Sequence, residues 1–499
     1  MRPATIRCQF LSLHLLSANL NQPNPPARPA VGRSLAWVAG MTLLGAGRAL
    51  ASDFEAADIL SFPWRGFVVR PQLSVSTIAT DNVFYGNNSA TAQTVYRPLI
   101  VTNGTFALGP ATTNYTILRA KESDLLAYVS PGVNVEYGNG GLNRALFSYQ
   151  NDQLVYLNHP AEDATQHHFT LDTNYKEGAV TFHGRDTYAM LSSPQGGGSY
   201  LNLLGLVINR NTLDDVYNVQ VDVTEKSSIY ARGSHSSTDY EQGLPIYDTD
   251  NVSGTLGWAY SPAALLALTV EGYYGQSAVG SNYPGLGKGP HSEFMGGFVG
   301  AKGEFTPKLQ GTVKLGVETR DFPGVVNGAS IVSPAFDVAV TYTATPLTQA
   351  TLNYTRRTDL SGYYNGQTLI GNTITLSVQH SLGSSGRWIL GARASWFQNE
   401  YSAVYQPIAV LATDVSGNVL FDSIGRAVYK SVAANYARTE TMMGAGLQVS
   451  YQPRPWLVVS LAYDFSTYTP QFGDANVAAS HPSIDYTDNR ATFRIGIGF

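Results

Sequence analysis

The sequence predicts an all-β transmembrane protein, an antiparallel up-and-down barrel of about 18 strands, with 16 as the next count. Three observations predict it: few charges, strict alternation at the C-terminus, and short turns that alternate with long loops. Only 13% of the 499 residues are charged, whereas soluble domains average about 25%. The mean hydropathy is −0.09, and no apolar run reaches the 18 residues that a spanning helix needs.

The final nine residues alternate strictly, with an apolar side chain at every odd position from Ala491 to Phe499. Successive side chains of a strand point to opposite faces, so one face suits hydrocarbon and the other suits water. An open edge of this kind invites aggregation, whereas a closed barrel has no edge. The terminal Phe499 also resembles the C-terminal signature of bacterial outer-membrane barrels. An edge strand of a soluble β-sandwich is the alternative for this segment.

The first 51 residues are expected to be an N-terminal extension followed by a signal peptide. Arg33 precedes an apolar stretch over 35–47, and Ala49 and Ala51 supply an Ala-x-Ala site. This order of features is typical of a secretory signal, so we expect cleavage after Ala51. A short buried helix is the alternative.

The mature chain is expected to begin with a periplasmic lead-in over 52–65, and the barrel is expected to occupy 66–499. The only cysteine, Cys8, precedes the expected cleavage site. The sequence therefore predicts neither a disulfide framework nor a thiolate metal site in the mature chain.

Alternating segments mark the strands in order along the chain. They are expected near 66–77, 124–137, 143–156, 165–176, 178–190, 213–223, 228–239, 247–260, 265–277, 292–305, 309–321, 335–344, 349–358, 368–380, 387–399, 437–451, 456–467 and 486–499. Short connections rich in Pro, Gly or Ser join them pairwise, as at Ser261-Pro-Ala263 and Thr306-Pro-Lys308. Short turns at one end and long loops at the other are typical of outer-membrane barrels, whose short turns are periplasmic. An even number of strands puts both ends of the barrel in the periplasm.

Longer loops are expected at the extracellular end. They lie near 79–122, 191–211, 278–291, 321–334, 400–436 and 468–485, and the first has room for an extra hairpin at Thr94–Phe106. Loop 400–436, or else loop 79–122, is a candidate to fold inward and narrow the lumen. The alternative is that both loops remain on the rim.

Charged residues at water-facing strand positions are the candidates for a lumen lining, because a barrel of 16 to 18 strands is wide enough for an aqueous channel. The principal candidates are Arg232, Glu271, Lys314, Glu318, Arg320, Asp337, Arg357, Arg393, Arg438, Glu440, Arg490 and Arg494, with Asp152, Asp172, Asp222 and Glu304 as further members. Charges of both signs facing a lumen would tune ion selectivity. The alternative is that they pair with one another and only solvate the wall.

The sequence predicts no enzyme, cofactor, metal site or nucleic-acid partner. It has no His-Glu metal motif and no Gly-x-Ser-x-Gly nucleophile elbow, and the Gly-rich segment 195–199 lacks the Lys-Ser/Thr of a phosphate cradle. His167 and His168 are neighbours on a strand, so they face opposite sides. Acidic residues outnumber basic ones by 36 to 31, which does not favour binding to nucleic acid.

Two stretches carry a family resemblance. Arg70-Pro71 is followed by Asp81-Asn82-Val83-Phe84, and Ser123-Asp124-Leu125 is followed by Val129-Ser130-Pro131-Gly132, a Tyr-rich strand and His167-His168. These motifs resemble the start of the β-barrel porin 2 family of bacterial outer-membrane proteins, and with the hairpin rhythm the resemblance covers most of 66–499. The chain departs from the pattern in a long insertion between Asn87 and Lys121.

The resemblance implies a place in the outer membrane of a Gram-negative bacterium. The partners would then be outer-membrane lipid and lipopolysaccharide, the barrel assembly machinery and a small hydrophilic solute. A homo-oligomer, which porins often form, is compatible with the resemblance, although no residue pattern predicts it.

A porin-like channel for passive diffusion of small hydrophilic solutes or ions is therefore the predicted function. Two alternatives stay open: an exit port for extracellular polysaccharide, and a non-conducting structural or adhesive barrel. A plugged, energised receptor would need about 22 strands and a separate plug domain, for which the chain has no room. Two packed soluble β-domains are the remaining alternative for the fold.

Overall fold

The computed structural model describes the barrel and little of the segment before it. The described residues are 61–86, 120–138, 142–194, 207–240, 247–281, 291–323, 330–360, 367–383, 386–403, 405–411, 429–435, 437–474 and 485–498. The expected signal peptide with its cleavage after Ala51, the hairpin at 94–106 and the terminal Phe499 lie outside them. Among the described residues no helix is long and apolar enough to cross a membrane.

Antiparallel strands make up almost all of the described structure. They are β1 (Phe62–Trp64), β2 (Phe67–Thr80), β3 (Asp124–Tyr137), β4 (Arg144–Tyr156), β5 (Ala164–Glu177), β6 (Val180–Ser193), β7 (Ile208–Thr224), β8 (Ser227–Tyr240), β9 (Tyr247–Ala263), β10 (Leu266–Ser281), β11 (His291–Thr306), β12 (Leu309–Asp321), β13 (Ile331–Thr345), β14 (Thr348–Leu360), β15 (Thr368–Leu382), β16 (Trp388–Tyr401), β17 (Tyr405–Leu411), β18 (Tyr429–Asn435), β19 (Arg438–Arg454), β20 (Leu457–Phe472) and β21 (Tyr486–Ile497). One short 3₁₀ turn, η1 (Pro160–Glu162), lies between β4 and β5.

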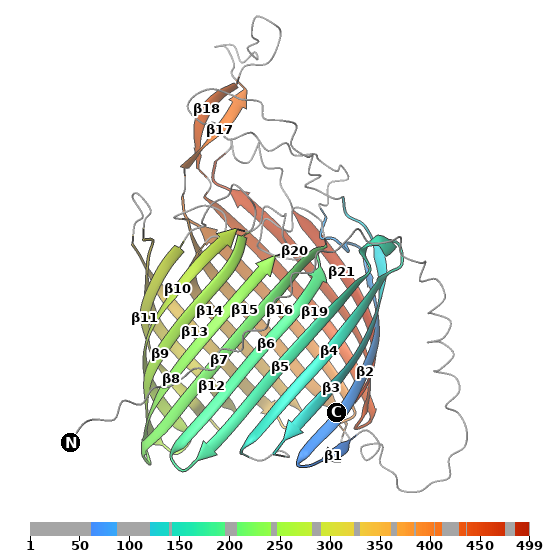
Figure 1. Ribbon diagram of the computed structural model, residues 1–499, viewed down its shortest axis with the longest axis vertical. Coiled ribbons are helices and arrows are strands. Elements are labelled where there is room, and N and C mark those ends of the chain that lie inside the picture. The colour runs from blue at the N-terminus through green and yellow to red at the C-terminus, as the bar shows by residue number, and fades with distance from the viewer. Residues whose placement is uncertain are drawn as a thin grey trace, which may run out of the picture. The chain divides into compact units, whose positions relative to one another are not determined.

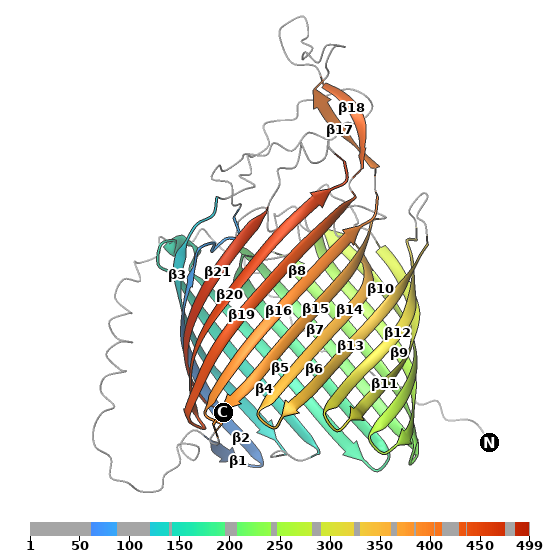
Figure 2. The same cartoon turned by 180° about the vertical axis from the view of Figure 1, so that it is seen from behind.

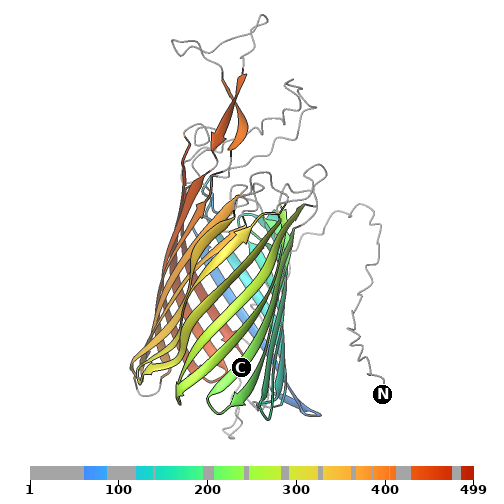
Figure 3. The same ribbon diagram turned by 90° about the vertical axis from the view of Figure 1, so that its left-hand side faces the viewer.

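Eighteen of the described strands form one closed barrel. Each strand from β2 to β16, and then β19 to β21, pairs with its neighbours in the chain, and β21 pairs back onto β2. Figures 1 and 2 show the two sides of this wall, with every strand tilted in the same sense, and Figure 3 shows the tilt from the side. The expected count of 18 strands is therefore confirmed, and the alternative of 16 is wrong.

Turns at one end of the barrel are tight, and threonine stabilises several of them. The backbone N–H groups of Lys226, Lys308 and Leu347 each donate to the hydroxyl of the threonine two residues earlier, at 3.2, 3.3 and 3.3 Å. Such side-chain bonds satisfy backbone donors that the tight turn leaves without a ladder partner. The β5–β6 turn instead uses Gly178, whose φ is +56°, a conformation that glycine adopts at little cost.

The two faces of the wall differ sharply in chemistry. Leu256, Val299 and Leu461 occupy one face and expose 70%, 59% and 59% of their surface. Residues that pair directly across strands share a face, so this apolar face can be followed from strand to strand around the barrel. It is the outer face, and the polar face lines the inside.

Aromatic rings border the apolar belt of the outer face on both sides. Near the tight turns lie Phe67, Tyr137, Tyr175, Tyr260, Tyr342, Trp388 and Tyr451, and further from the turns, on these or other strands, lie Tyr149, Phe169, Tyr188, Tyr217, Tyr274, Tyr354, Trp396 and Tyr463. Neighbouring rings are in contact: the ring centroids of Trp388 and Tyr451 are 4.4 Å apart, and those of Tyr149 and Phe169 are 4.9 Å apart. An apolar band between two aromatic girdles is what a barrel presents to a lipid bilayer.

Two elements differ from the sequence expectation. Residues 62–64, expected to belong to a lead-in, form the short strand β1, which pairs with Phe67–Val69 on the edge of β2 beyond the end of β21. Loop 400–436 contains the hairpin β17–β18, whose strands pair only with each other. Both elements are too short, and too irregular in their polarity, for alternation to reveal them.

The lipid-facing belt can be tested with one pair of variants. Leu256→Arg puts a charge into hydrocarbon and is expected to lower the free energy of unfolding by about 2–4 kcal/mol. Thr255→Arg, one residue away on the inner face, is the matched control and should change it much less. The measurement is urea-dependent refolding into lipid vesicles, and equal effects of the two variants would contradict the assignment of the faces.

Candidate functional site

The inner wall is recognised by side chains that reach across intervening strands, which only the concave face of a barrel allows. Arg320 of β12 donates to the Ser277 hydroxyl of β10 at 3.2 Å. The same guanidinium donates to the backbone carbonyl of Thr358 on β14 at 2.8 Å. Rows of registered residues extend this face around the wall, for example Arg232–Thr255–Tyr273 over β8 to β10.

All twelve sequence-predicted lining residues lie on this inner face. Strand pairing places them there: Arg232, Glu271, Lys314, Glu318, Arg320, Asp337, Arg357, Arg393, Arg438, Glu440, Arg490 and Arg494. That they line a solute path remains a prediction.

Most of these charges form ion pairs. The bridging distances are 2.7 Å for Lys314–Glu271, 3.6 Å for Arg320–Glu318, 3.4 Å for Arg357–Asp337, 2.6 Å for Arg393–Asp464 and 2.8 Å for Arg438–Glu440. Arg490 pairs with Asp488. These residues thus pair with one another, which is part of the alternative that the sequence left open.

Burial divides the paired charges into two kinds. The side chains of Arg320 and Arg438 are 3% and 1% exposed, so their charges belong to the body of the wall. Arg357 and Arg393 are 60% and 68% exposed. A buried pair stabilises or destabilises the wall according to its geometry. An exposed charge can instead interact with ions in the water beside it.

Inner cations that form no ion pair with any described residue include Arg185, Arg232, Lys302 and Arg494. Arg232 and Arg494 come from the predicted set, and Arg185 and Lys302 were not singled out by the sequence. All four are exposed. The alternation of the sequence places all four at water-facing positions of their strands. Whether each has a partner depends on the register with neighbouring strands, which the sequence does not show.

The start of the first long loop turns onto the inner face. Val83 and Phe84, 3% and 1% exposed, pack against Leu126, Leu154 and Tyr156 of β3 and β4. Asn82 holds the turn: its side chain accepts from the backbone N–H of Gly86 at 2.6 Å and donates to the Gly86 carbonyl at 2.8 Å. Loop 79–122 therefore folds inward over 82–84, and residues 87–119 lie outside the described residues.

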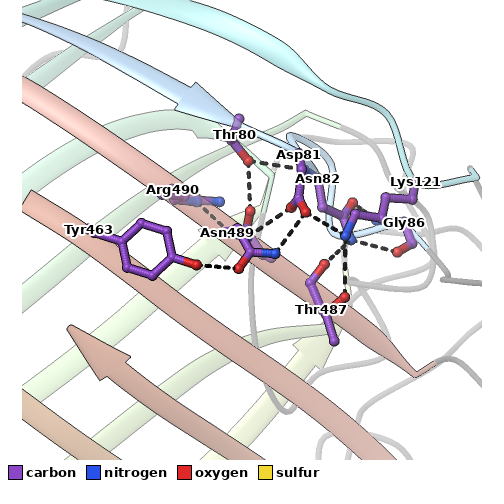
Figure 4. Close-up of polar contacts among 10 residues, drawn as sticks. Thr80, Asp81, Asn82, Gly86, Lys121, Tyr463, Thr487, Asn489 and Arg490 are labelled. Carbon is purple, nitrogen blue, oxygen red and sulfur yellow. Dashed lines mark hydrogen bonds and ion pairs between the residues drawn. The ribbon is translucent and has the colours of Figure 1, made fainter.

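The same segment closes the seam between the first and last barrel strands (Figure 4). Asp81 accepts from the backbone and side-chain N–H groups of Asn489 at 2.8 and 2.7 Å, and its carboxylate also meets Lys121 at 2.7 Å. Thr80 donates to Asp488 at 2.7 Å on the inner face. We call these five residues the seam clamp.

Electrostatics favour the charged form of Asp81. Burial alone would raise the pKa of this carboxyl, but the bonds from Lys121 and Asn489 outweigh it and leave the pKa below its ordinary value. Asp81 lies beyond the end of β2, where it is accessible to solvent. The Asp81 carboxyl is thus expected to be charged at neutral pH.

No group of three or more His, Cys, Asp or Glu side chains in the described part of the chain is placed to hold a metal ion. His167 instead lies on the outer face, where its ring nitrogen is 3.0 Å from the Tyr149 hydroxyl. His168 faces inward toward Asp152 at 3.2 Å.

These features define an outer-membrane β-barrel: a closed antiparallel wall, an apolar belt between aromatic girdles, and a polar, charged inner face. We therefore place the protein in the outer membrane.

Comparison with known proteins gives distant structural matches. No family model matches the chain, and no curated protein matches it. Among solved structures, it is similar to OpdK of Pseudomonas aeruginosa with vanillate, at 8% identity and a TM-score of 0.40, over 86% of this chain and 99% of that one. It is also similar to OpdO of the same organism, at 10% identity and 0.40 over 86% and 97%. The siderophore receptor PirA of Acinetobacter baumannii matches at 10% and 0.40 over 86% and 80%.

Arg320 and Arg357 are expected to behave differently when truncated. Arg320→Ala leaves Glu318 buried without its cation and should lower the free energy of unfolding by about 3–5 kcal/mol. Arg357→Ala removes an exposed pair and should cost about 1 kcal/mol or less. Urea midpoints in lipid vesicles measure both, and equal losses would contradict the division by burial.

The seam clamp should weaken in acid. Because the folded pKa of Asp81 is lowered, its contribution to stability is present above the ordinary carboxyl pKa and is lost as the pH falls through the lowered value. Asp81→Asn is therefore expected to be less heat-resistant than the wild type at pH 7, and the difference should shrink toward pH 3. The temperature at which the folded band disappears in semi-native electrophoresis measures this; a constant difference would contradict it.

Proposed function

We propose that the protein is a porin-like outer-membrane channel through which small hydrophilic solutes or ions diffuse passively. The observation that supports this most directly is the exposure of charged side chains on the inner wall, with Arg357 and Arg393 60% and 68% exposed. A wall whose inner face was packed against other protein would bury such groups. Eighteen strands also give a barrel wide enough for water.

Charges on the wall set which ions pass. The unpaired Arg185, Arg232, Lys302 and Arg494 attract anions, whereas the paired acids and bases contribute little net field. The inward-packed residues 82–84 narrow the lumen beside β2, β3 and β4. We further propose membership of the β-barrel porin 2 family, on the strength of the Asp81–Phe84 motif.

Channel activity predicts discrete current steps from the refolded mature chain in a planar bilayer. Arg494→Gln combined with Arg357→Gln removes two exposed inner cations and should shift ion selectivity toward cations. The matched control is Arg356→Gln, because Arg356 is the neighbour of Arg357 on the outer face and donates to Asn372 there. An inserted barrel that carries no current would contradict the proposed channel. Unchanged ion selectivity in the double variant would show only that Arg357 and Arg494 do not set the selectivity.

A further inference from the structure

Two tyrosines lie flat on the inner wall, each over a glycine of the next strand. A Cβ atom at Gly257 of β9 would stand 2.2 Å from the ring of Tyr230 on β8. A Cβ at Gly296 of β11 would stand 2.4 Å from the hydroxyl oxygen of Tyr273 on β10. Because glycine has no Cβ, each ring can rest against the backbone while it stays partly exposed to the lumen.

Each tyrosine bonds to a glutamate on the far side of its glycine. The Tyr230 hydroxyl donates to Glu271 at 2.5 Å, and the Tyr273 hydroxyl donates to Glu318 at 3.0 Å. The residues of each set are direct neighbours across three strands, as Tyr230–Gly257–Glu271 and Tyr273–Gly296–Glu318.

A cation completes each set. Lys314 donates to Glu271 at 2.7 Å, and Arg320 lies 3.6 Å from Glu318. The unit of tyrosine, glycine and glutamate therefore occurs twice, displaced by two strands, and each glutamate has a cation, from two strands away for Glu271 and from the same strand for Glu318. Repetition of a whole unit, including the glycine that lets the ring lie flat, indicates more than incidental packing.

Two phenylalanines flank the ring of Tyr273. Phe298 lies over Gly316 with its ring centroid 5.4 Å from that of Tyr273, and the Phe294 centroid lies 6.3 Å from Tyr273 on the other side. Phe298 is only 7% exposed, so we call the partly exposed Tyr230, Tyr273 and Phe294 the aromatic strip. It crosses β8 to β11 on the inner wall.

We propose that the aromatic strip is a saccharide track on the wall of the channel. The apolar C–H face of a sugar ring packs against an aromatic ring, and its hydroxyls both donate and accept hydrogen bonds. Glu271 supplies acceptors and Lys314 supplies donors beside the rings. Because these charges neutralise each other, they offer hydrogen bonds without selecting an ion, which favours a neutral polyol over a charged solute.

This inference rests on the proposed channel, and the experiment separates the two. Maltohexaose is added to single channels of the full mature chain in a planar bilayer, with polyethylene glycol of matched hydrodynamic size as a probe of exclusion alone. The wild type should be blocked by maltohexaose at lower concentrations than by the polymer. In Tyr230→Ala/Tyr273→Ala the half-blocking concentration of the sugar should rise about tenfold, as expected when two ring contacts are lost.

Matched variants isolate the rings. Tyr274→Ala removes a tyrosine from the same strand but on the outer face, and it should leave sugar block unchanged. Tyr230→Phe/Tyr273→Phe keeps the rings and loses only the bonds to the glutamates, so it should raise the half-blocking concentration about two- to threefold. These milder variants also serve if the double alanine variant fails to fold.

The outcomes are distinct. Current steps with equal block by sugar and polymer, or a sugar block that survives loss of both rings, would overturn the track and leave the channel intact. Absence of current would overturn the proposed channel. Calorimetric titration of maltohexaose into the folded protein in detergent would then test whether the aromatic strip binds a saccharide. Binding that disappears in the double alanine variant but not in Tyr274→Ala would support it, and no binding to the wild type would overturn it.

Discussion

Closure of the sheet is the constraint on which the rest of the structure depends. Hydrocarbon offers no partner to a backbone N–H or C=O group, so a sheet in a bilayer must pair its first strand with its last. Here Leu73–Thr80 pairs with Arg490–Ile497, segments from the two ends of the barrel sequence. This seam is short, because β1 rather than β21 covers the remaining edge of β2. The seam clamp adds side-chain bonds on both faces at the point where backbone pairing ends.

Closure also fixes which residues face the lumen. A slip of one residue at the seam would move every inner side chain of a strand to the lipid face, which would put Arg494 into hydrocarbon and Phe493 into water. The ion pairs of the inner wall depend on this register, because Lys314 and Glu271 lie two strands apart and meet only on the concave side. Buried pairs such as Arg320–Glu318 then add a penalty to any register that would separate them.

Local pattern was enough to predict most strands but not their contacts. The segments 124–137 and 309–321 match the observed strands at both ends, because alternation and turn chemistry are local properties. Arg320 and Arg357 looked equivalent in the sequence, since both are cations at water-facing positions. Their difference in burial arises from Phe294, Ser292 and the Thr358 carbonyl, which come from other strands. Pairings between residues about 40 positions apart cannot be found without the register.

The glycines show the same limit. In the sequence Gly257 and Gly296 are simply small residues within alternating segments, and nothing local connects either to a tyrosine about 25 positions away. In the folded wall each allows a ring to lie flat and reach a glutamate one strand further on. Arg320 therefore has two effects: it offsets the charge of Glu318 inside the wall, and it helps to hold the carboxylate that orients Tyr273. The residues that stabilise the wall and those that would meet a passing solute are thus coupled, and a barrel that lost Arg320 would be expected to lose the position of the ring as well.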